Sequence, residues 1–216
     1  MKVLVAGANG QTARQLVRML VENGHEVRGL IRKEDQMQNV ESDGAEPVLA
    51  DLEQDNADGK IGEVVVGCDA VIFAAGAGPG SGNERKETMD RDGAIKLIEA
   101  AEKHGARRYL MLSTMGADDP ESRDEKMQPY MRAKGEADAR LRNSTLDYTI
   151  IRPGRLTDDA GTGTIVAAES LGQYGEITRE DVARAFAATL EAENTHGKTI
   201  EILSGDTSIE ETIESV

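Results

Sequence analysis

Two groups of residues in this sequence could do chemistry, and they lie far apart along the chain. Near the amino terminus, Gly7, Gly10 and Ala13 follow a short apolar run at a spacing of three residues. Glycine permits a tight turn and a close approach of backbone to ligand, and alanine allows close packing of helix on strand. A helix that begins beyond Gly10 would direct unpaired N–H groups at a phosphate. The pattern therefore predicts a nucleotide-binding loop.

The second group is Tyr130 and Lys134, which are separated by four residues. On a helix this spacing places the phenol and the ammonium on one face. The segment 124–142 has a helical pattern, and it follows a predicted strand that ends at Ser113. A hydroxyl, a phenol and an ammonium would therefore be contributed by neighbouring elements.

The elements that must position these groups alternate along the chain. Short apolar runs predict strands at Val3–Ala6, Glu26–Ile31, Pro47–Ala50, Ala70–Ala75, Arg108–Ser113, Tyr148–Arg152 and Thr199–Leu203. Amphipathic stretches predict helices at Gln11–Glu22, Glu34–Ser42, Lys60–Val66, Glu84–Lys103, Asp124–Arg142 and Arg179–Glu191. This alternation predicts an α/β fold, a single doubly wound Rossmann domain over residues 1–216. Its sheet would be mostly parallel, with about seven strands and helices on both faces.

Two glycine-rich stretches, Gly76–Gly82 and Asp158–Gly163, are predicted to be loops that follow strands. Both would lie at the carboxyl edge of the sheet, where open α/β folds bind ligands. After the sixth strand, the pattern predicts only the loop Thr157–Tyr174, one helix, one strand and an acidic tail.

The end of the second predicted strand bears on the choice of dinucleotide. A site for NAD usually has a carboxylate there, about 20 residues after the glycine loop, to hold the ribose 2′-hydroxyl. Here the positions are Arg32 and Lys33, whose charges suit a 2′-phosphate. NADP is therefore expected, with NAD less favoured. In the alternative interpretation, Arg32 and Lys33 are only solvated, and Glu34 or Asp35 turns inward to accept the hydroxyls.

Composition restricts the partners. Forty acidic against 25 basic residues give a net charge of −15, which argues against nucleic-acid binding. The sequence contains no long uncharged apolar run for a membrane and begins directly with a predicted strand, so a cytoplasmic location is expected. The histidines, His25, His104 and His196, and the lone Cys68 have no metal-ligand spacing, so no metal is expected. A small-molecule substrate is expected, and monomer and homodimer both remain open.

Further landmarks follow the predicted strands, at Ala50-Asp51-Leu52, Phe73-Ala74-Ala75-Gly76, Ser113-Thr114, Tyr130–Lys134 and Arg152-Pro153-Gly154. Together with the glycine loop they resemble the atypical short-chain dehydrogenase/reductase superfamily. More narrowly, the chain resembles its small NAD(P)-binding, NAD-dependent epimerase/dehydratase-like members. The resemblance covers nearly the whole sequence.

This resemblance implies which residues contact the cofactor. They are Gly7, Asn9, Gly10, Gln11, Thr12, Ala13, Arg32, Lys33, Asp51, Leu52, Ala74, Ala75, Gly76, Ser113, Lys134, Pro153, Gly154, Arg155 and Leu156. In the family, Asp51 and Leu52 would bracket the adenine, residues 74–76 would line the adenosine side, and the Pro153-Gly154 turn would lie against the nicotinamide.

The resemblance also implies catalytic roles for Ser113, Tyr130 and Lys134. The tyrosine would be the general acid or base, and the lysine would lower the pKa of the phenol and hold the nicotinamide ribose. Ser113 or Thr114 would hydrogen-bond the substrate oxygen. Asp90 stands where many members of the family carry an asparagine.

Three functions follow from these expectations. The first is NADPH-dependent reduction of a small carbonyl, quinone or flavin-like acceptor. The second is a non-catalytic NADP-binding module that senses redox state or regulates a partner. The third is a nucleotide-sugar epimerase or dehydratase, which ranks lower because larger relatives hold the sugar nucleotide with a C-terminal lobe that this chain lacks.

Overall fold

Nine strands form one sheet in the computed structural model, which describes residues 1–56, 59–78, 80–122 and 124–216. In spatial order they are β11 (Thr207–Ser208), β8 (Thr164–Ala168), β10 (Lys198–Ser204), β6 (Asp147–Pro153), β5 (Arg108–Leu112), β4 (Ala70–Phe73), β1 (Lys2–Ala6), β2 (Glu26–Ile31) and β3 (Glu46–Leu49). The seven strands from β10 to β3 are parallel. All seven strands expected from the sequence are therefore confirmed.

The other strands were not expected. β8 pairs antiparallel with β10 and β11, and it lies within the segment 157–174 that the sequence pattern predicted to be a loop. That prediction is wrong: Thr164–Ala168 is an apolar run like those of the predicted strands, and it becomes a strand by pairing with β10, some 30 residues further along the chain. A separate two-stranded sheet joins β7 (Arg155–Thr157) to β9 (Glu176–Thr178).

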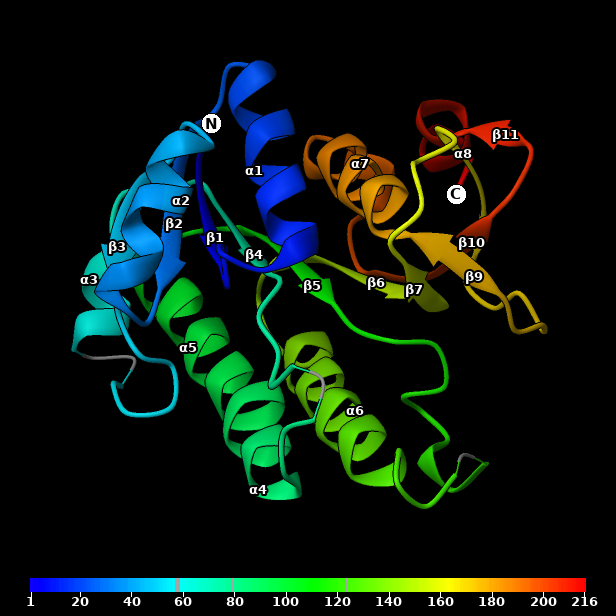
Figure 1. Ribbon diagram of the computed structural model, residues 1–216, viewed down its shortest axis with the longest axis horizontal. Coiled ribbons are helices and arrows are strands. Elements are labelled where there is room, and N and C mark those ends of the chain that lie inside the picture. The colour runs from blue at the N-terminus through cyan, green and yellow to red at the C-terminus, as the bar shows by residue number, and fades with distance from the viewer. Residues whose placement is uncertain (57–58, 79, 123) are drawn as a thin grey trace.

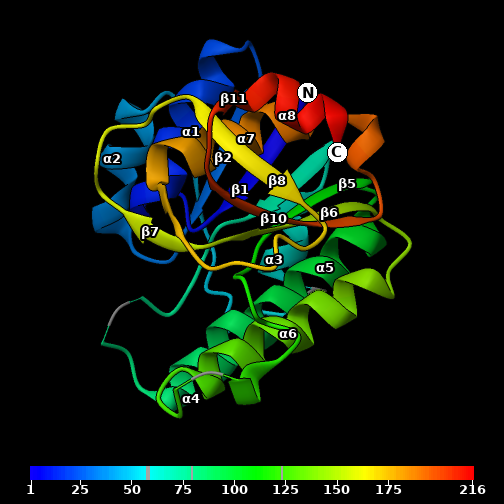
Figure 2. The same cartoon turned by 90° about the vertical axis from the view of Figure 1, so that its right-hand side faces the viewer.

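Helices cover both faces of the central sheet, as predicted (Figures 1 and 2). One face carries α1 (Gln11–Glu22), α2 (Met37–Ser42), α7 (Arg179–Leu190) and α8 (Ile209–Ser215). The other carries α3 (Lys60–Val65), α5 (Ala94–His104) and α6 (Gln128–Arg142). Each face has its own apolar core, in which buried side chains of the helices pack on the strands.

The helix α1 has the predicted bounds because its apolar side chains recur at helical spacing. Leu16, Val17 and Leu20 are buried against the sheet, and the helix ends before Gly24, which has a φ of +85°. Helix α6 begins at Gln128 rather than at the predicted Asp124, and Pro129 lies in its first turn, where proline is favoured.

The predicted helix 84–103 is divided into three parts. It begins as α4 (Asn83–Arg85), continues as the π-helix η2 (Lys86–Gly93) and becomes regular in α5. The wider turns of η2 are not readable from apolar spacing, and π-helical turns frequently occur at functional sites. The remaining elements are the short 3₁₀ helices η1 (Glu34–Gln36), η3 (Pro120–Ser122) and η4 (Glu193–Thr195).

The two predicted glycine-rich loops are irregular in the structure, except that residue 79 of the first lies outside the described residues. No helix in the described part of the chain combines the length and apolar character that a membrane span requires.

Candidate functional site

The glycine loop joins β1 to α1 at the carboxyl edge of the sheet. Gly7 has a φ of +77°, and a Cβ atom there would lie 2.7 Å from the Cα atom of Ala75. Gly10 is the N-cap of α1, and no side chain caps the helix there. The first N–H groups of α1 therefore face the loop, and the absence of side chains lets a ligand approach the backbone. This cradle fits the pyrophosphate of a dinucleotide.

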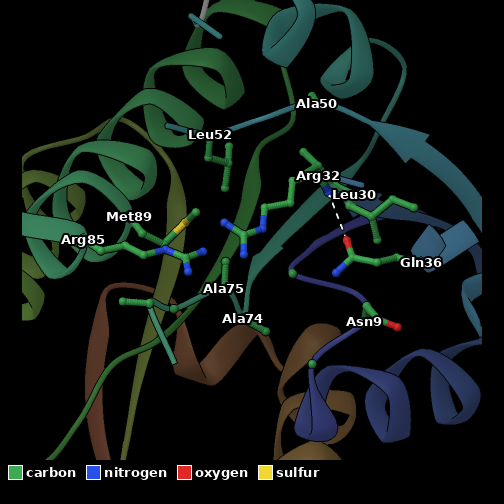
Figure 3. Close-up of a pocket in the computed structure, with 15 residues that line it drawn as sticks. Asn9, Leu30, Arg32, Gln36, Ala50, Leu52, Ala74, Ala75, Arg85 and Met89 are labelled. Atoms are coloured by element: carbon green, nitrogen blue, oxygen red, sulfur yellow. Dashed lines mark hydrogen bonds between the residues drawn. The ribbon is translucent and has the colours of Figure 1, made fainter. Parts of the chain in front are cut away.

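A pocket of about 260 Å³ opens on one side of the loop, and we call it the Arg32 pocket. Figure 3 shows its lining, drawn from the ends of β1, β2, β3 and β4 and from the region of α4 and η2. Its residues are Gly7, Asn9, Gly10, Leu30, Ile31, Arg32, Gln36, Ala50, Leu52, Ala74, Ala75, Gly76, Ala77, Arg85 and Met89. The lining includes apolar side chains, among them Leu30, Leu52 and Met89, which suit contact with an adenine ring.

Arg32 projects into this pocket, whereas its neighbour Lys33 is exposed and lies outside the lining. The backbone N–H groups of both residues donate to Oε1 of Gln36 at 3.3 Å, which fixes the turn after β2. Glu34 and Asp35 are exposed and outside the lining, so the inward carboxylate of the alternative interpretation is not found in this structure.

A second pocket, of about 760 Å³, continues from the first, and we call it the Tyr130 pocket. The two pockets share Gly10 and the segment 74–77, so they form one cleft along the sheet edge. The described lining of the second is Gly10, Gln11, Thr12, Ala13, Ala74, Ala75, Gly76, Ala77, Gly78, Gly80, Ser81, Lys86, Asp90, Leu112, Ser113, Thr114, Lys126, Met127, Tyr130, Lys134, Pro153, Gly154, Leu156 and Arg179.

The ammonium of Lys134 is held at the base of the Tyr130 pocket. Its Nζ atom lies 3.2 Å from Oδ1 of Asp90 and donates to the carbonyl of Leu112 at 3.1 Å. It also lies 5.3 Å from the ring centroid of Phe73 and 5.9 Å from that of Tyr130. Burial by itself lowers the pKa of Lys134, but the negative charges around it, Asp90 foremost, outweigh burial and raise the pKa. The lysine therefore stays charged.

The phenol of Tyr130 differs from the expectation. Burial raises its pKa, and the nearby charge of Lys134 opposes this shift without reversing it. The prediction that the lysine brings the pKa of the phenol below its usual value is therefore wrong for the net shift. The reason is that burial outweighs the charge of Lys134, and the charges of Asp90 and Asp138 raise the pKa of Tyr130 further. In this pocket Tyr130 is a protonated hydroxyl at neutral pH.

Ser113 also belongs to the Tyr130 pocket, but its hydroxyl donates to Oδ2 of Asp138 at 2.7 Å. The same oxygen accepts two hydrogen bonds from Arg152, at 3.0 and 2.7 Å, and Arg152 reaches onward to Asp118 at 2.8 Å. Asp138 and Arg152 are both buried. Burial raises the pKa of Asp138, while Arg152 acts to lower it.

Most residues predicted to contact the cofactor or substrate line this cleft, with three exceptions. Lys33, Asp51 and Arg155 are outside both linings. The Asp51 carboxylate accepts the N–H of Glu53 at 2.9 Å, and exposed Arg155 pairs with Glu176 across β7 and β9.

Several residues of the cleft were not expected from the sequence, foremost Arg85 and Met89 in the first pocket and Lys86, Lys126 and Arg179 in the second. The spacing of Asp138, four residues after Lys134 on α6, is a signal that could have found it. Nothing local to Arg85 points to the cleft. Within the described ranges, no three His, Cys, Asp or Glu side chains gather as metal ligands.

Comparison with known proteins agrees with this geometry. Residues 7–193 match the model of the family described as NAD(P)H-binding. The "uncharacterized sugar epimerase YhfK" of Bacillus subtilis is 42% identical over 217 residues, and the alignment covers 100% of both chains.

Two solved structures are also similar. One is a Bacillus halodurans protein whose name assigns it to the NAD-dependent epimerase/dehydratases, with 40% identity, a TM-score of 0.95 and 100% coverage of both chains. The oxidoreductase ylbE of Lactococcus lactis is 29% identical, with a TM-score of 0.88 over 100% of this chain and 96% of its own.

Proposed function

The chain belongs to the NAD(P)H-binding family, and from that premise we propose that it is an NADPH-dependent oxidoreductase that reduces a small carbonyl, quinone or flavin-like acceptor. The observation that carries the proposal is the continuity of the two pockets. The glycine loop and the Tyr130–Lys134 pair line one cleft, which they share through Gly10 and residues 74–77. A dinucleotide that lies along this cleft would bring its nicotinamide beside the phenol of Tyr130, which can donate a proton.

The charges of the Arg32 pocket support NADP over NAD. Arg32 and Arg85 are part of the lining, and none of the described lining residues is acidic. Guanidinium groups bind phosphate well, and the nearby carboxylate of Glu53 is paired with both arginines rather than free to accept from a 2′-hydroxyl.

In the proposed reduction, the side chains of the Tyr130 pocket have different roles. When bound, the cofactor supplies a hydride for the carbon of a carbonyl acceptor. The Tyr130 hydroxyl supplies the proton that the carbonyl oxygen then needs, so that an alcohol results. Lys134 remains positive beside the Tyr130 ring and stabilises the phenolate that Tyr130 becomes. Pro153 and Gly154 form the wall on the sixth strand.

The proposal is tested by mixing the protein with NADPH and a panel of quinones, flavins and aldehydes while following the absorbance of NADPH. Oxidation that depends on both protein and acceptor supports a reductase. A nucleotide sugar belongs in the same panel, because the Bacillus subtilis relative is named a sugar epimerase. NADPH binding without turnover of any acceptor would contradict the reductase.

The non-catalytic NADP-binding module is the second candidate, and one observation favours it. The proton of Ser113 is engaged by Asp138, so this hydroxyl does not donate into the pocket, and burial raises the pKa of Tyr130, which makes its phenol a weaker acid. Such a module would bind NADPH and associate with another protein in a cofactor-dependent way. Co-sedimentation with and without NADPH separates this function from the reductase.

A further inference from the structure

A carboxylate lies between the two arginines of the Arg32 pocket. Oε2 of Glu53 is 3.4 Å from Nη1 of Arg32 and 3.5 Å from Nε of Arg85. Its other oxygen, Oε1, accepts a hydrogen bond from the Thr88 hydroxyl at 2.6 Å. Figure 3 shows that the guanidinium groups of Arg32 and Arg85 approach each other from opposite sides of the pocket. Two segments distant in sequence, Arg32 after β2 and residues 85–88 of α4 and η2, thus converge on one anion.

The geometry is that of an anion-binding site that is occupied by a carboxylate of the protein itself, that of Glu53. Two guanidinium groups and one hydroxyl are the donors that bind a phosphate monoester. A phosphate carries about −1.5 to −2 charges near pH 7, so it interacts more strongly with these donors than a single carboxylate does. It would also repel Glu53 if both stayed in place, because like charges at contact distance are unfavourable.

We propose that Glu53 occupies, in the free protein, the position of the 2′-phosphate of NADP, and that NADP binds by displacing this carboxylate from Arg32 and Arg85. Glu53 is then a specificity-determining residue: it keeps the two arginines paired and aligned, and it weakens NADP binding. Arg85 is a second ligand of the 2′-phosphate. The inference rests on the NADP preference of the proposed function.

The side chain of Glu53 can move without a change in the backbone. Nζ of Lys96 donates to the carbonyls of Leu52 and Glu53, at 3.0 and 3.2 Å, and the N–H of Glu53 donates to Asp51. These contacts fix the peptide on both sides of the residue. The Glu53 side chain is 21% exposed, so solvent is available to the displaced carboxylate.

The experiment measures the dissociation constants of NADPH and NADH by fluorescence for the wild type and Glu53→Gln. Glutamine keeps the size and the partner of Thr88 but removes the competing charge. We expect NADPH to bind more tightly by about tenfold or more, the value of one charge-assisted contact, and NADH to change by less than about twofold. Glu87→Gln, which makes the same change of charge on an exposed part of η2 outside both pockets, controls for net charge.

A second variant tests Arg85. We expect Arg85→Ala to weaken NADPH about tenfold or more and to leave NADH nearly unchanged, because only NADPH carries the 2′-phosphate. Arg91→Ala is the matched control, since Arg91 lies on η2, pairs with Asp92 and Glu136, and is outside both linings. Calorimetry with adenosine 2′,5′-bisphosphate and adenosine 5′-monophosphate isolates the same contact from the rest of the cofactor.

The outcomes separate this inference from the proposed function. If wild type binds NADH as tightly as NADPH, the NADP preference itself fails. A different outcome overturns only the inference. In that outcome, Arg32→Ala removes the preference for NADPH over NADH, but Glu53→Gln and Arg85→Ala leave this preference unchanged. Weaker NADH binding by Glu53→Gln would also overturn it, because Glu53 would then be an acceptor for the ribose hydroxyls.

Discussion

The hydroxyl of Ser113 donates its proton to the carboxylate of Asp138 across 2.7 Å, from the end of β5 to the inward face of α6. A serine hydroxyl has one proton, so Ser113 in this arrangement can accept a hydrogen bond in the cleft but cannot donate one. The expected role of Ser113 as a donor to the substrate oxygen therefore requires its hydroxyl to rotate away from Asp138. In the proposed reduction, Tyr130 is the proton donor.

Asp138→Asn should destabilise the fold. The neutral amide leaves the buried guanidinium of Arg152 without its one fully buried charge partner among the described residues, and breaking a buried pair costs about 3 kcal/mol or more. Urea unfolding measures the loss. Ser113→Ala, which removes only the hydroxyl, should cost about 1 kcal/mol. Equal losses for the two variants would show that Arg152 does not depend on the charge of Asp138.

Tyr130→Phe should lower NADPH oxidation by about a hundredfold to ten-thousandfold, the usual contribution of a general acid. The affinity for NADPH should stay the same, because the phenylalanine keeps the ring that lines the pocket. Steady-state rates and fluorescence titration measure the two quantities. Tyr148→Phe, on β6 and outside both pocket linings, is the matched control. Undiminished turnover by Tyr130→Phe would exclude the phenol as proton donor.

Asp90 and Lys134 should be energetically coupled. Each is buried, so Asp90→Asn and Lys134→Met should each lower the free energy of unfolding by about 3 kcal/mol by leaving the other charge unpaired. The double variant should lose less than the sum of the two single losses, since no unpaired charge remains. Chemical unfolding of the four proteins measures the coupling. Additive losses would mean that the 3.2 Å pair is not an interaction that stabilises the fold.

Gly7→Ala should abolish NADPH binding and lower stability by more than about 2 kcal/mol, because the new methyl group would lie 2.7 Å from the Cα atom of Ala75 in a backbone with positive φ. Gly24→Ala is a matched control. Gly24 also has a positive φ, +85°, but no atom lies within 4 Å of the methyl position, so only the backbone strain of about 1 kcal/mol is expected. Similar losses of stability in the two variants would show that the close approach of Gly7 to Ala75 does not restrict this position.

Asp118 should contribute stability that depends on pH. The hydrogen bond from Arg152, with the charges of Arg152 and Arg142, lowers the pKa of Asp118 from 3.8 to about 2. A lowered pKa in the folded state means that the contribution is complete above about pH 4 and is lost as the pH falls toward 2. Because the side chain is 60% exposed, solvent screens the pairs and the contribution stays near 1 kcal/mol or below.

Urea unfolding of Asp118→Asn between about pH 3 and pH 7 tests this dependence. The variant should be less stable than wild type at neutral pH, and the difference should shrink on acidification. The exposed Asp35→Asn is the control, for which a smaller difference is expected at every pH. A difference that grows as the pH falls would contradict the lowered pKa.

Local patterns in the sequence were sufficient for much of the fold. The seven parallel strands are short runs rich in apolar or β-branched residues, and helix α1 has its apolar residues at regular spacing between a glycine turn and a glycine stop. The glycine loop was predictable for the same reason, since Gly7 and Gly10 meet backbone requirements that act within a few residues. The π-helix η2 escaped prediction because its wider turns give no distinctive apolar spacing, whereas β8 is an apolar run that was missed between glycine-rich segments and that pairs with the distant β10.

The site divides in the same way. By itself, the sequence determined the phosphate-binding loop, the arginine after β2 and the tyrosine and lysine on one face of α6, because each depends on neighbours in the chain. Only the tertiary structure decided that Asp138 and Arg152 hold Ser113, and that Glu53 lies between Arg32 and Arg85. These groups come from separate elements, and only the packing of helices on the sheet brings their charges within hydrogen-bonding distance.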